Sequence, residues 1–216
     1  TLAENMMPGE LGWFGIWPPG EHTDGLQLDE LEYLLCKSLA LDAPISLQTD
    51  VSTMEAHPLT PGLLEMFRRY EQLRMDRALP REQTAPLGEI GRDFVMLQDG
   101  GDIRFAAVEP LEEVGGSGDV RATVGAVASG SVATIWHFCG REGAITLDLP
   151  PGALKLTGFD GEQLAFEVQN GRAAIPFAGR RNTLLCEGIA PGQLHAALRR
   201  GEVAVRPPTI LWVKAA

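Results

Sequence analysis

The feature that most constrains the fold of this chain is a change of sequence pattern near residue 80. Residues 1–80 alternate short apolar runs with segments of helical periodicity, whereas residues 84–216 consist of short alternating runs separated by turn residues. Alternating strands and helices favour a parallel sheet covered by helices, and successive short strands favour an antiparallel β-sandwich. The sequence therefore predicts an α/β domain over 1–80 followed by an all-β domain over 84–216.

The first half contains two successive strand–loop–helix units. Strands are expected at 11–17 and 43–49, and helices at 26–41 and 59–74. The spacing of the units fits parallel strands joined by a helical crossover. Two parallel strands cannot close a barrel or form a sheet covered on both faces. We therefore expect earlier units of the same fold, or another chain, to cover the strand edges.

The second half is divided into short strands by frequent turns. Asn170-Gly171 is the strongest hairpin signal, because both residues accept the positive φ angles of a type I′ turn. In the run 144–149, Ile145 and Leu147 alternate with polar residues and are expected to face a core. The complete set of expected strands is 94–98, 103–108, 121–127, 132–139, 144–149, 163–168, 172–177, 183–187 and 210–213.

Charge and composition exclude several classes of partner. The formal net charge of -11 argues against nucleic acid and anionic membrane surfaces, which are bound by clustered Lys and Arg. No apolar run approaches the ~20 residues that span a bilayer.

The chain has three cysteines, Cys36, Cys139 and Cys186, which lack the spacing of metal ligands. Either Cys139 and Cys186 form a disulfide or all three cysteines are free and buried. The cysteines therefore leave the redox compartment of the protein open. Phosphate-loop, dinucleotide and zinc-protease motifs are missing, and no cofactor or metal is predicted.

The loop after the first strand holds the first group of candidate site residues. Ligands of parallel α/β folds bind at the carboxyl ends of the strands. Glu10 precedes its strand and is therefore expected at the opposite end, as a surface or structural carboxylate. The loop residues predicted to contact substrate are Trp17, Glu21, His22 and Asp24. The indole of a strand-end Trp can stack on a sugar ring, and the polar side chains can donate or accept hydrogen bonds or protons.

The loop after the second strand provides an equivalent group. It contains Asp50, Glu55 and His57, and it follows a strand that we expect to pair in parallel with the first. Neighbouring parallel strands bring their following loops to one rim, so the two groups are predicted to line one cleft. The alternative for each individual residue is an ordinary solvated loop side chain.

The order of elements resembles that of many glycoside hydrolases, in which a (β/α) barrel is followed directly by an antiparallel C-terminal sandwich. The resemblance rests on the two βα units at 9–75 and on the strand-and-turn succession VATIWHFCGREGAITLDLP and LTGFDGEQLAFEVQNGRAAIPFAGRRNTLLCEG. It implies that 1–80 forms the last two units of a TIM-type barrel and that 84–216 buttresses it. The implied partners are a carbohydrate and the preceding part of the barrel.

The resemblance does not identify a catalytic residue. In one large clan of these enzymes a nucleophilic glutamate ends barrel strand seven, where this chain has Trp17-Pro18-Pro19 and only later Glu21. Glycoside hydrolysis normally uses two carboxylates, roughly 5–5.5 Å or 6.5–9.5 Å apart. At least one usually comes from an earlier strand. The alternative function is a non-catalytic carbohydrate-binding or structural sandwich with a small α/β extension.

Overall fold

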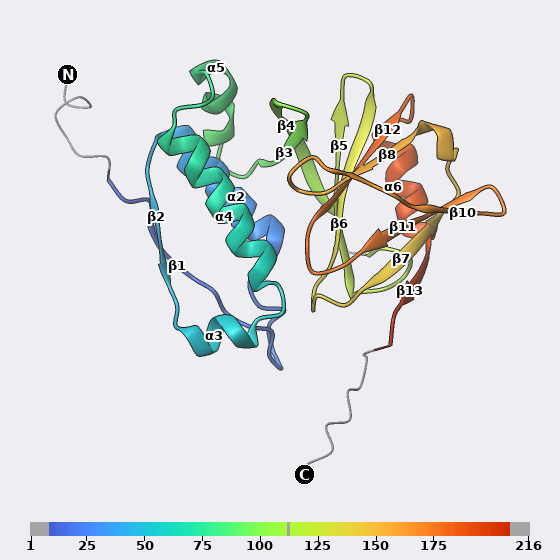
Figure 1. Cartoon of the computed structure of the whole chain (residues 1–216), viewed down its shortest axis with the longest axis horizontal. Coiled ribbons are helices and arrows are strands. Elements are labelled where there is room, and N and C mark those ends of the chain that lie inside the picture. The colour runs from blue at the N-terminus through green and yellow to red at the C-terminus, as the bar shows by residue number, and fades with distance from the viewer. Residues whose placement is uncertain (1–8, 112, 208–216) are drawn as a thin grey trace, which may run out of the picture.

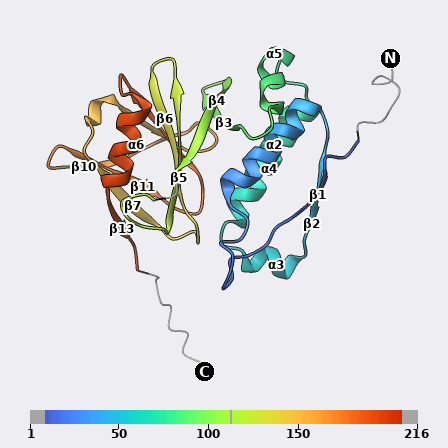
Figure 2. The same ribbon diagram turned by 180° about the vertical axis from the view of Figure 1, so that it is seen from behind.

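The computed structural model describes residues 9–111 and 113–207, which stack in four layers (Figure 1). A two-stranded sheet lies at one end, followed by a layer of helices, a seven-stranded sheet and a four-stranded sheet. The view from behind shows the same order, with helix α2 in front of helix α4 (Figure 2). The chain is therefore an α/β part joined to a larger β-rich part.

The two-stranded sheet is parallel, as the sequence predicts. Strand β1 (Gly12–Gly15) pairs with β2 (Ile45–Gln48), and the register runs from Gly12↔Ile45 to Gly15↔Gln48. Phe14 of β1 packs against the apolar cluster of the helices, whereas its neighbour Trp13 is 74% exposed. Alternation along the strand thus leaves one face of this sheet open.

Two long helices cover the other face of β1 and β2. Helix α2 (Leu28–Leu41) buries its Leu31 and Leu35, and helix α4 (Thr60–Met75) buries Tyr70 among other residues. Both contribute to one apolar cluster that also includes residues of the seven-stranded sheet. Three shorter elements complete this part, namely α3 (Val51–Ala56), α5 (Arg81–Thr84) and the 3-10 turn η1 (Ala85–Gly88).

The β-rich part consists of two antiparallel sheets. The larger one has the order β3-β4-β5-β6-β12-β8-β9, and the smaller one β10-β11-β7-β13. Their inner faces and helix α6 enclose a second apolar core that includes Val120, Ile135 and Ile175. The bounds are β3 Asp93–Asp99, β4 Asp102–Leu111, β5 Val120–Val127, β6 Gly130–His137, β7 Gly143–Leu147, η2 Pro151–Ala153, β8 Leu154–Thr157, β9 Gln163–Leu164, β10 Glu167–Gln169, β11 Arg172–Phe177, β12 Asn182–Glu187, α6 Pro191–Arg200 and β13 Glu202–Val205.

Most of the expected strands are present, with differences towards the end of the chain. Asn170 and Gly171 adopt φ angles of 52° and 78° at the turn between β10 and β11, as the hairpin signal predicts. The expected strand 163–168 is divided, because its first part pairs with β8 and its last part with β11. The expected strand 210–213 lies outside the described residues. One edge of the smaller sheet is formed by β13, and β8 belongs to the larger sheet; the sequence analysis identified neither strand.

The α/β part and the β-rich part are joined by a buried ion pair. The Glu32 carboxylate of α2 accepts hydrogen bonds from Arg181 Nη1 at 2.7 and 2.9 Å, from the Tyr70 hydroxyl at 2.8 Å and from the Met96 N–H at 2.9 Å. The side chains of Glu32 and Arg181 are each only 2% exposed. Elements from both parts thus satisfy the same carboxylate, which fixes their relative placement.

Further polar contacts support this interface. The buried Trp136 of β6 donates its indole N–H to Gln27 Oε1 at 3.0 Å. Lys37 of α2 donates to the carbonyl oxygens of Leu87 and Arg92, both at 2.9 Å.

All three cysteines are free, so the structure contains no Cys139–Cys186 disulfide. Among the described residues, the parallel sheet has two strands and does not close into a barrel.

Candidate functional site

The loops that follow β1 and β2 leave the sheet at the same edge, because the two strands are parallel and Gly15 pairs with Gln48. The first loop is closed by a hydrogen bond from the Leu26 N–H to the Trp17 carbonyl at 2.9 Å. Gly25 has a φ of +71°, and a Cβ there would lie 2.6 Å from the Trp17 carbonyl oxygen. Glycine is therefore required where the loop returns to the helix.

The first loop exposes all four of its predicted site residues. Trp17 is 63% exposed, and Glu21 and His22 are exposed at the tip of the loop. Asp24 is exposed as well, but it forms an ion pair with Arg121 of β5. This pair anchors the loop to the seven-stranded sheet. Asp24 therefore has a structural role besides the substrate contact predicted for it.

The second loop places its residues differently. Asp50 caps α3: its Oδ1 accepts from the Ser52 hydroxyl at 2.6 Å and from the Thr53 N–H at 2.8 Å, and these hydrogen bonds lower its pKa. Glu55 is exposed on α3. His57 is buried, and its Nδ1 accepts from the Leu59 N–H at 3.1 Å. Burial lowers the pKa of His57, which favours the neutral imidazole.

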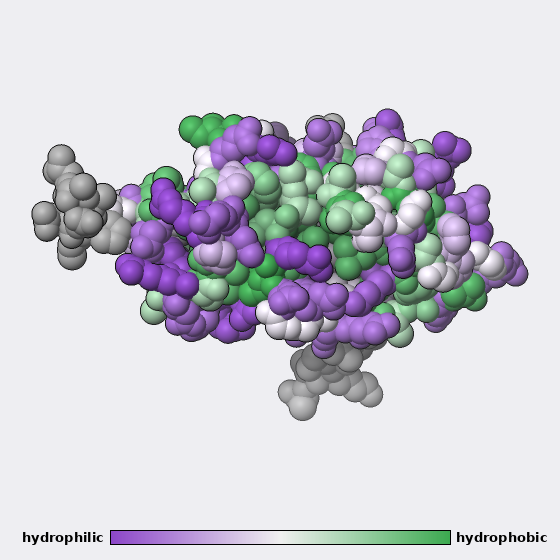
Figure 3. Space-filling model, turned by 90° about the horizontal axis from the view of Figure 1, so that it is seen from above, coloured by the Kyte–Doolittle hydropathy of each residue, from purple (hydrophilic) through white to green (hydrophobic). Residues whose placement is uncertain are grey.

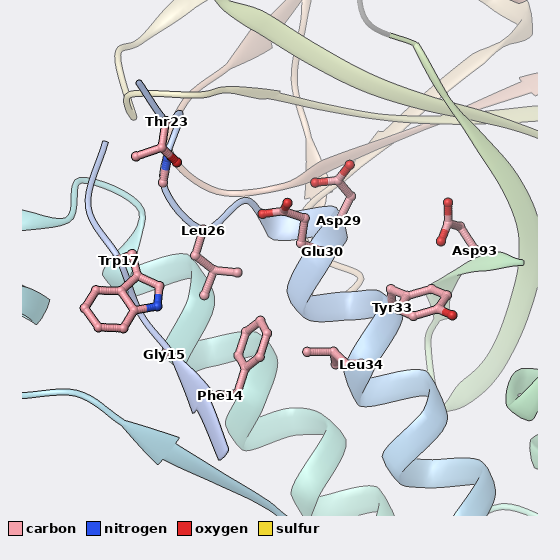
Figure 4. Close-up of a pocket in the computed structure, with 11 residues that line it drawn as sticks. Phe14, Gly15, Trp17, Thr23, Leu26, Asp29, Glu30, Tyr33, Leu34 and Asp93 are labelled. Carbon is pink, nitrogen blue, oxygen red and sulfur yellow. The ribbon is translucent and has the colours of Figure 1, made fainter. Parts of the chain in front are cut away.

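A groove of about 680 Å³ lies beside the first loop, between β1 and α2 (Figure 4). Trp17 and Phe14 approach it from the β1 side, and Tyr33 and Leu34 approach it from α2. At the end towards the seven-stranded sheet the groove is bordered by acidic side chains. These are Asp29, Glu30 and Asp93. The groove therefore combines an apolar wall with an acidic rim.

Two of these carboxyl groups have altered acidity. Burial, followed by repulsion from Glu30, raises the pKa of Asp29 to about 6. Asp29 Oδ1 is enclosed and has no hydrogen-bond partner among the residues that the structure describes. Burial also raises the pKa of Asp93, and the nearby Lys37 opposes this effect. Carboxyl groups of this kind favour a proton or a cationic partner.

Sequence reasoning did not single out this groove. In the sequence, Asp29 and Glu30 are simply acidic residues at the start of a helix, where carboxylates oppose the positive end of the helix dipole. Asp93 belongs to a strand of the other half of the chain. Its proximity to Asp29 depends on how the two parts pack, and no local pattern indicates it.

The remaining features offer less for a site. Within residues 9–111 and 113–207, no group of three or more His, Cys, Asp or Glu side chains could hold a metal ion, and none of the helices has the length and hydropathy to cross a membrane.

Another hollow, of 630 Å³, lies at the end of the curled seven-stranded sheet, with Leu97 and Leu185 in its wall. An ion pair of 3.0 Å between Lys155 and Asp99 borders it. Seen from above, hydrophobic residues form a patch near the middle of the molecule, bordered by hydrophilic ones (Figure 3).

No protein-family model matches this chain, and no curated protein matches it by sequence. Among solved structures, it is similar to a family 39 glycoside hydrolase from the gut symbiont Bacteroides cellulosilyticus WH2, with 14% identity and a TM-score of 0.31 over 74% of this chain and 31% of that one. It is also similar to an Anoxybacillus alpha-amylase, with 14% identity and a TM-score of 0.32 over 74% of this chain and 33% of that one. The chain spans about a third of the length of either. Likeness at this level does not establish a family.

Proposed function

We propose that this chain is the C-terminal part of a glycoside hydrolase, whose carboxyl-end loops contribute to a carbohydrate-binding cleft. The supporting observation is the parallel pairing of β1 with β2, which sends both following loops to one edge of the sheet next to the exposed Trp17. This is the edge at which parallel α/β folds bind their ligands. The exposed indole offers a flat apolar surface for one face of a sugar ring.

In this proposal the β-rich part buttresses the α/β part. The buried pair of Glu32 and Arg181 and the hydrogen bond from Trp136 to Gln27 hold α2 against the seven-stranded sheet. The ion pair of Asp24 with Arg121 holds the first loop itself. The sheet thus keeps the loop in place for substrate. The chain contributes substrate contacts, and the acid and base of the reaction come from preceding βα units.

Affinity gel electrophoresis against a panel of soluble polysaccharides (starch, xylan and mixed-linkage β-glucan) tests this function. At least one polysaccharide is expected to slow the migration of the chain. In Trp17→Ala, the dissociation constant obtained from this retardation is expected to rise at least 10-fold. Trp13→Ala is the matched control, because Trp13 is also largely exposed but precedes the binding edge. Absence of retardation by every polysaccharide, or equal effects of the two substitutions, would overturn the proposal.

The alternative, a carbohydrate-binding module formed by the sandwich alone, lacks a supporting observation. Such modules present exposed aromatic platforms. Trp136 is 1% exposed, and both tyrosines of the chain, Tyr33 and Tyr70, belong to α2 and α4. Trp212 lies outside the described residues. Retardation that survives Trp17→Ala would favour this alternative.

A further inference from the structure

We infer that the groove between β1 and α2 is a docking surface for a strand–helix segment that carries a basic side chain. The strand of this segment would extend the sheet alongside β1, and its helix would lie in the groove beside α2. This inference rests on the proposed βα architecture and is independent of sugar binding. It is carried by three properties of the surface, namely an open strand edge, an apolar wall and an acidic rim.

The first property is the open edge of β1. Within the described residues, β1 pairs with β2 alone, so its other edge presents backbone N–H and C=O groups without strand partners. Exposed edges of this kind template the addition of another strand. A strand that continued the parallel pairing would lie roughly 4.8 Å from β1.

The second property is the apolar wall next to that edge. Phe14 and Leu34 are only half-buried, although both pack against the apolar cluster of the helices. They face the groove together with Leu26 and Tyr33 (Figure 4). Trp17 follows the carboxyl end of β1, and in this inference it stays outside the docked helix and open to the sugar. In a sheet of βα units, a helix that precedes α2 along the chain would pack beside α2, at the usual distance of about 8–10 Å between helix axes. The groove lies on the side of α2 where such a helix would pack. The wall therefore fits the apolar stripe of a helix.

The third property is the sign of the charge at the rim. The three acidic residues Asp29, Glu30 and Asp93 line the groove, and none of its described lining residues is Lys or Arg. Lys37, whose charge acts on Asp93, donates to two backbone carbonyls and lies 4.2 Å from the centre of the Tyr33 ring. Arg121, which borders a neighbouring hollow with Asp29 and Glu30, is paired with Asp24. Asp29 Oδ1 has no partner among the described residues. A Lys or Arg on the docked segment would supply the missing cation.

The same charge disfavours a second copy of the chain as the occupant. An isologous contact would bring the acidic rim of one copy against that of the other, because each copy presents the same patch. Like charges in such a contact cost affinity. A heterologous basic segment has no such conflict.

Two synthetic 18-residue amphipathic helices can serve as probes of the groove. They share one apolar stripe and differ only in lysines or glutamates flanking it. Isothermal titration calorimetry at pH 7.5 is expected to show binding of the lysine peptide at least 10-fold tighter than of the glutamate peptide. The double variant Asp29→Asn/Asp93→Asn is expected to abolish this preference, and Asp148→Asn, an exposed carboxylate of the β-rich part, should leave it unchanged.

Equal affinity for the two peptides would overturn the inference, as would absence of binding or a preference retained in the double variant. Self-association of the peptide-free chain that disappears in the double variant would also overturn it and identify a second copy as the occupant. The double variant is expected to keep its retardation by polysaccharide. Selective peptide binding without any retardation would therefore refute sugar binding while leaving the docking surface intact.

Discussion

Arg181 is a buried cation whose charge is balanced by a side chain from the other half of the chain. Its guanidinium donates to both oxygens of Glu32, and its second terminal nitrogen donates to the Met96 carbonyl at 2.8 Å. A buried pair of this kind stabilises the fold only modestly relative to an apolar substitute. Removal of one partner, however, leaves an uncompensated charge in the interior.

The substitution Arg181→Met is therefore expected to lower the free energy of unfolding by about 3–5 kcal/mol. Urea denaturation followed by circular dichroism measures this change. The adjacent Arg180→Met is the matched control, because Arg180 is largely exposed and pairs with Glu65 at 3.4 Å. That exposed pair is expected to be worth less than about 1 kcal/mol. Similar losses in the two variants would show that the buried pair has no special role.

Asp29 provides a second residue-scale prediction, which concerns pH. Its pKa is raised from the ordinary value of 3.8 to about 6, so the folded chain binds more protons than the unfolded chain between these values. Stability is then expected to fall as the pH rises through this window, because the ionised group is poorly solvated in the folded state. Asp29→Asn removes the penalty and is expected to raise the free energy of unfolding by roughly 1–3 kcal/mol at pH 7.5.

Urea denaturation of the wild type and Asp29→Asn at pH 4.5 and 7.5 measures the effect. The gain should be smaller at pH 4.5, where the wild-type carboxyl is protonated in the fold. Asp148→Asn should show no gain at either pH, since Asp148 is exposed. A gain that does not depend on pH would mean that the charge of Asp29 is not its cause.

At the scale of elements, the first loop depends on one glycine. Gly25→Ala would force a side chain into a φ of +71° and place its Cβ 2.6 Å from backbone atoms of Trp17 and Pro19. We expect a loss of roughly 1–3 kcal/mol in unfolding free energy and a loss of polysaccharide retardation, because Trp17 would move.

Gly91→Ala separates the effect of the positive φ angle from the effect of crowding around the new Cβ. Gly91 has a similar φ of +76°, but nothing lies within 4 Å of a Cβ built there. It should show only the smaller cost of the backbone conformation, of about 1 kcal/mol, and normal retardation. Equal behaviour of Gly25→Ala and Gly91→Ala in both measurements would contradict the importance of crowding in the loop.

The elements that sequence analysis predicted correctly are those defined by local pattern. The parallel pairing of β1 with β2, helices α2 and α4, and the turn at Asn170-Gly171 follow from periodicity and turn chemistry. The division of 163–168 between two sheets depends on which strands lie nearby, and its sequence does not encode that locally. The barrel and the domain limits at 1–80 and 84–216 stay predictions.

The candidate site was less accessible to sequence analysis. The alternation of strand and loop correctly placed Trp17 at the carboxyl edge, because that depends only on strand direction. The buried position of His57 and the capping role of Asp50 depend on the short helix α3, which was not expected. The acidic rim combines Asp29 with Asp93, two residues brought together only by packing between the halves.

At the scale of the whole molecule, the helical layer shares its core with the seven-stranded sheet. The apolar cluster around α2 and α4 includes Phe94 and Met96 of β3 and Trp136 of β6. Separation of the two parts would expose this cluster and would leave Glu32 and Arg181 unpaired. The change of sequence pattern near residue 80 thus marks a change of architecture without a break in the packing.

This shared core predicts that the described chain unfolds in one cooperative transition. Far-ultraviolet circular dichroism reports on the helices, of which α2 and α4 are the longest, and the near-ultraviolet signal of the buried Trp136 reports on the seven-stranded sheet. The two probes should give the same urea midpoint in the wild type, because neither part can lose its neighbour without losing part of its own core. In Arg181→Met both midpoints should fall together. Two separate midpoints in the wild type would instead show that the α/β and β-rich parts are independent folding units, with the buried pair merely positioning one against the other.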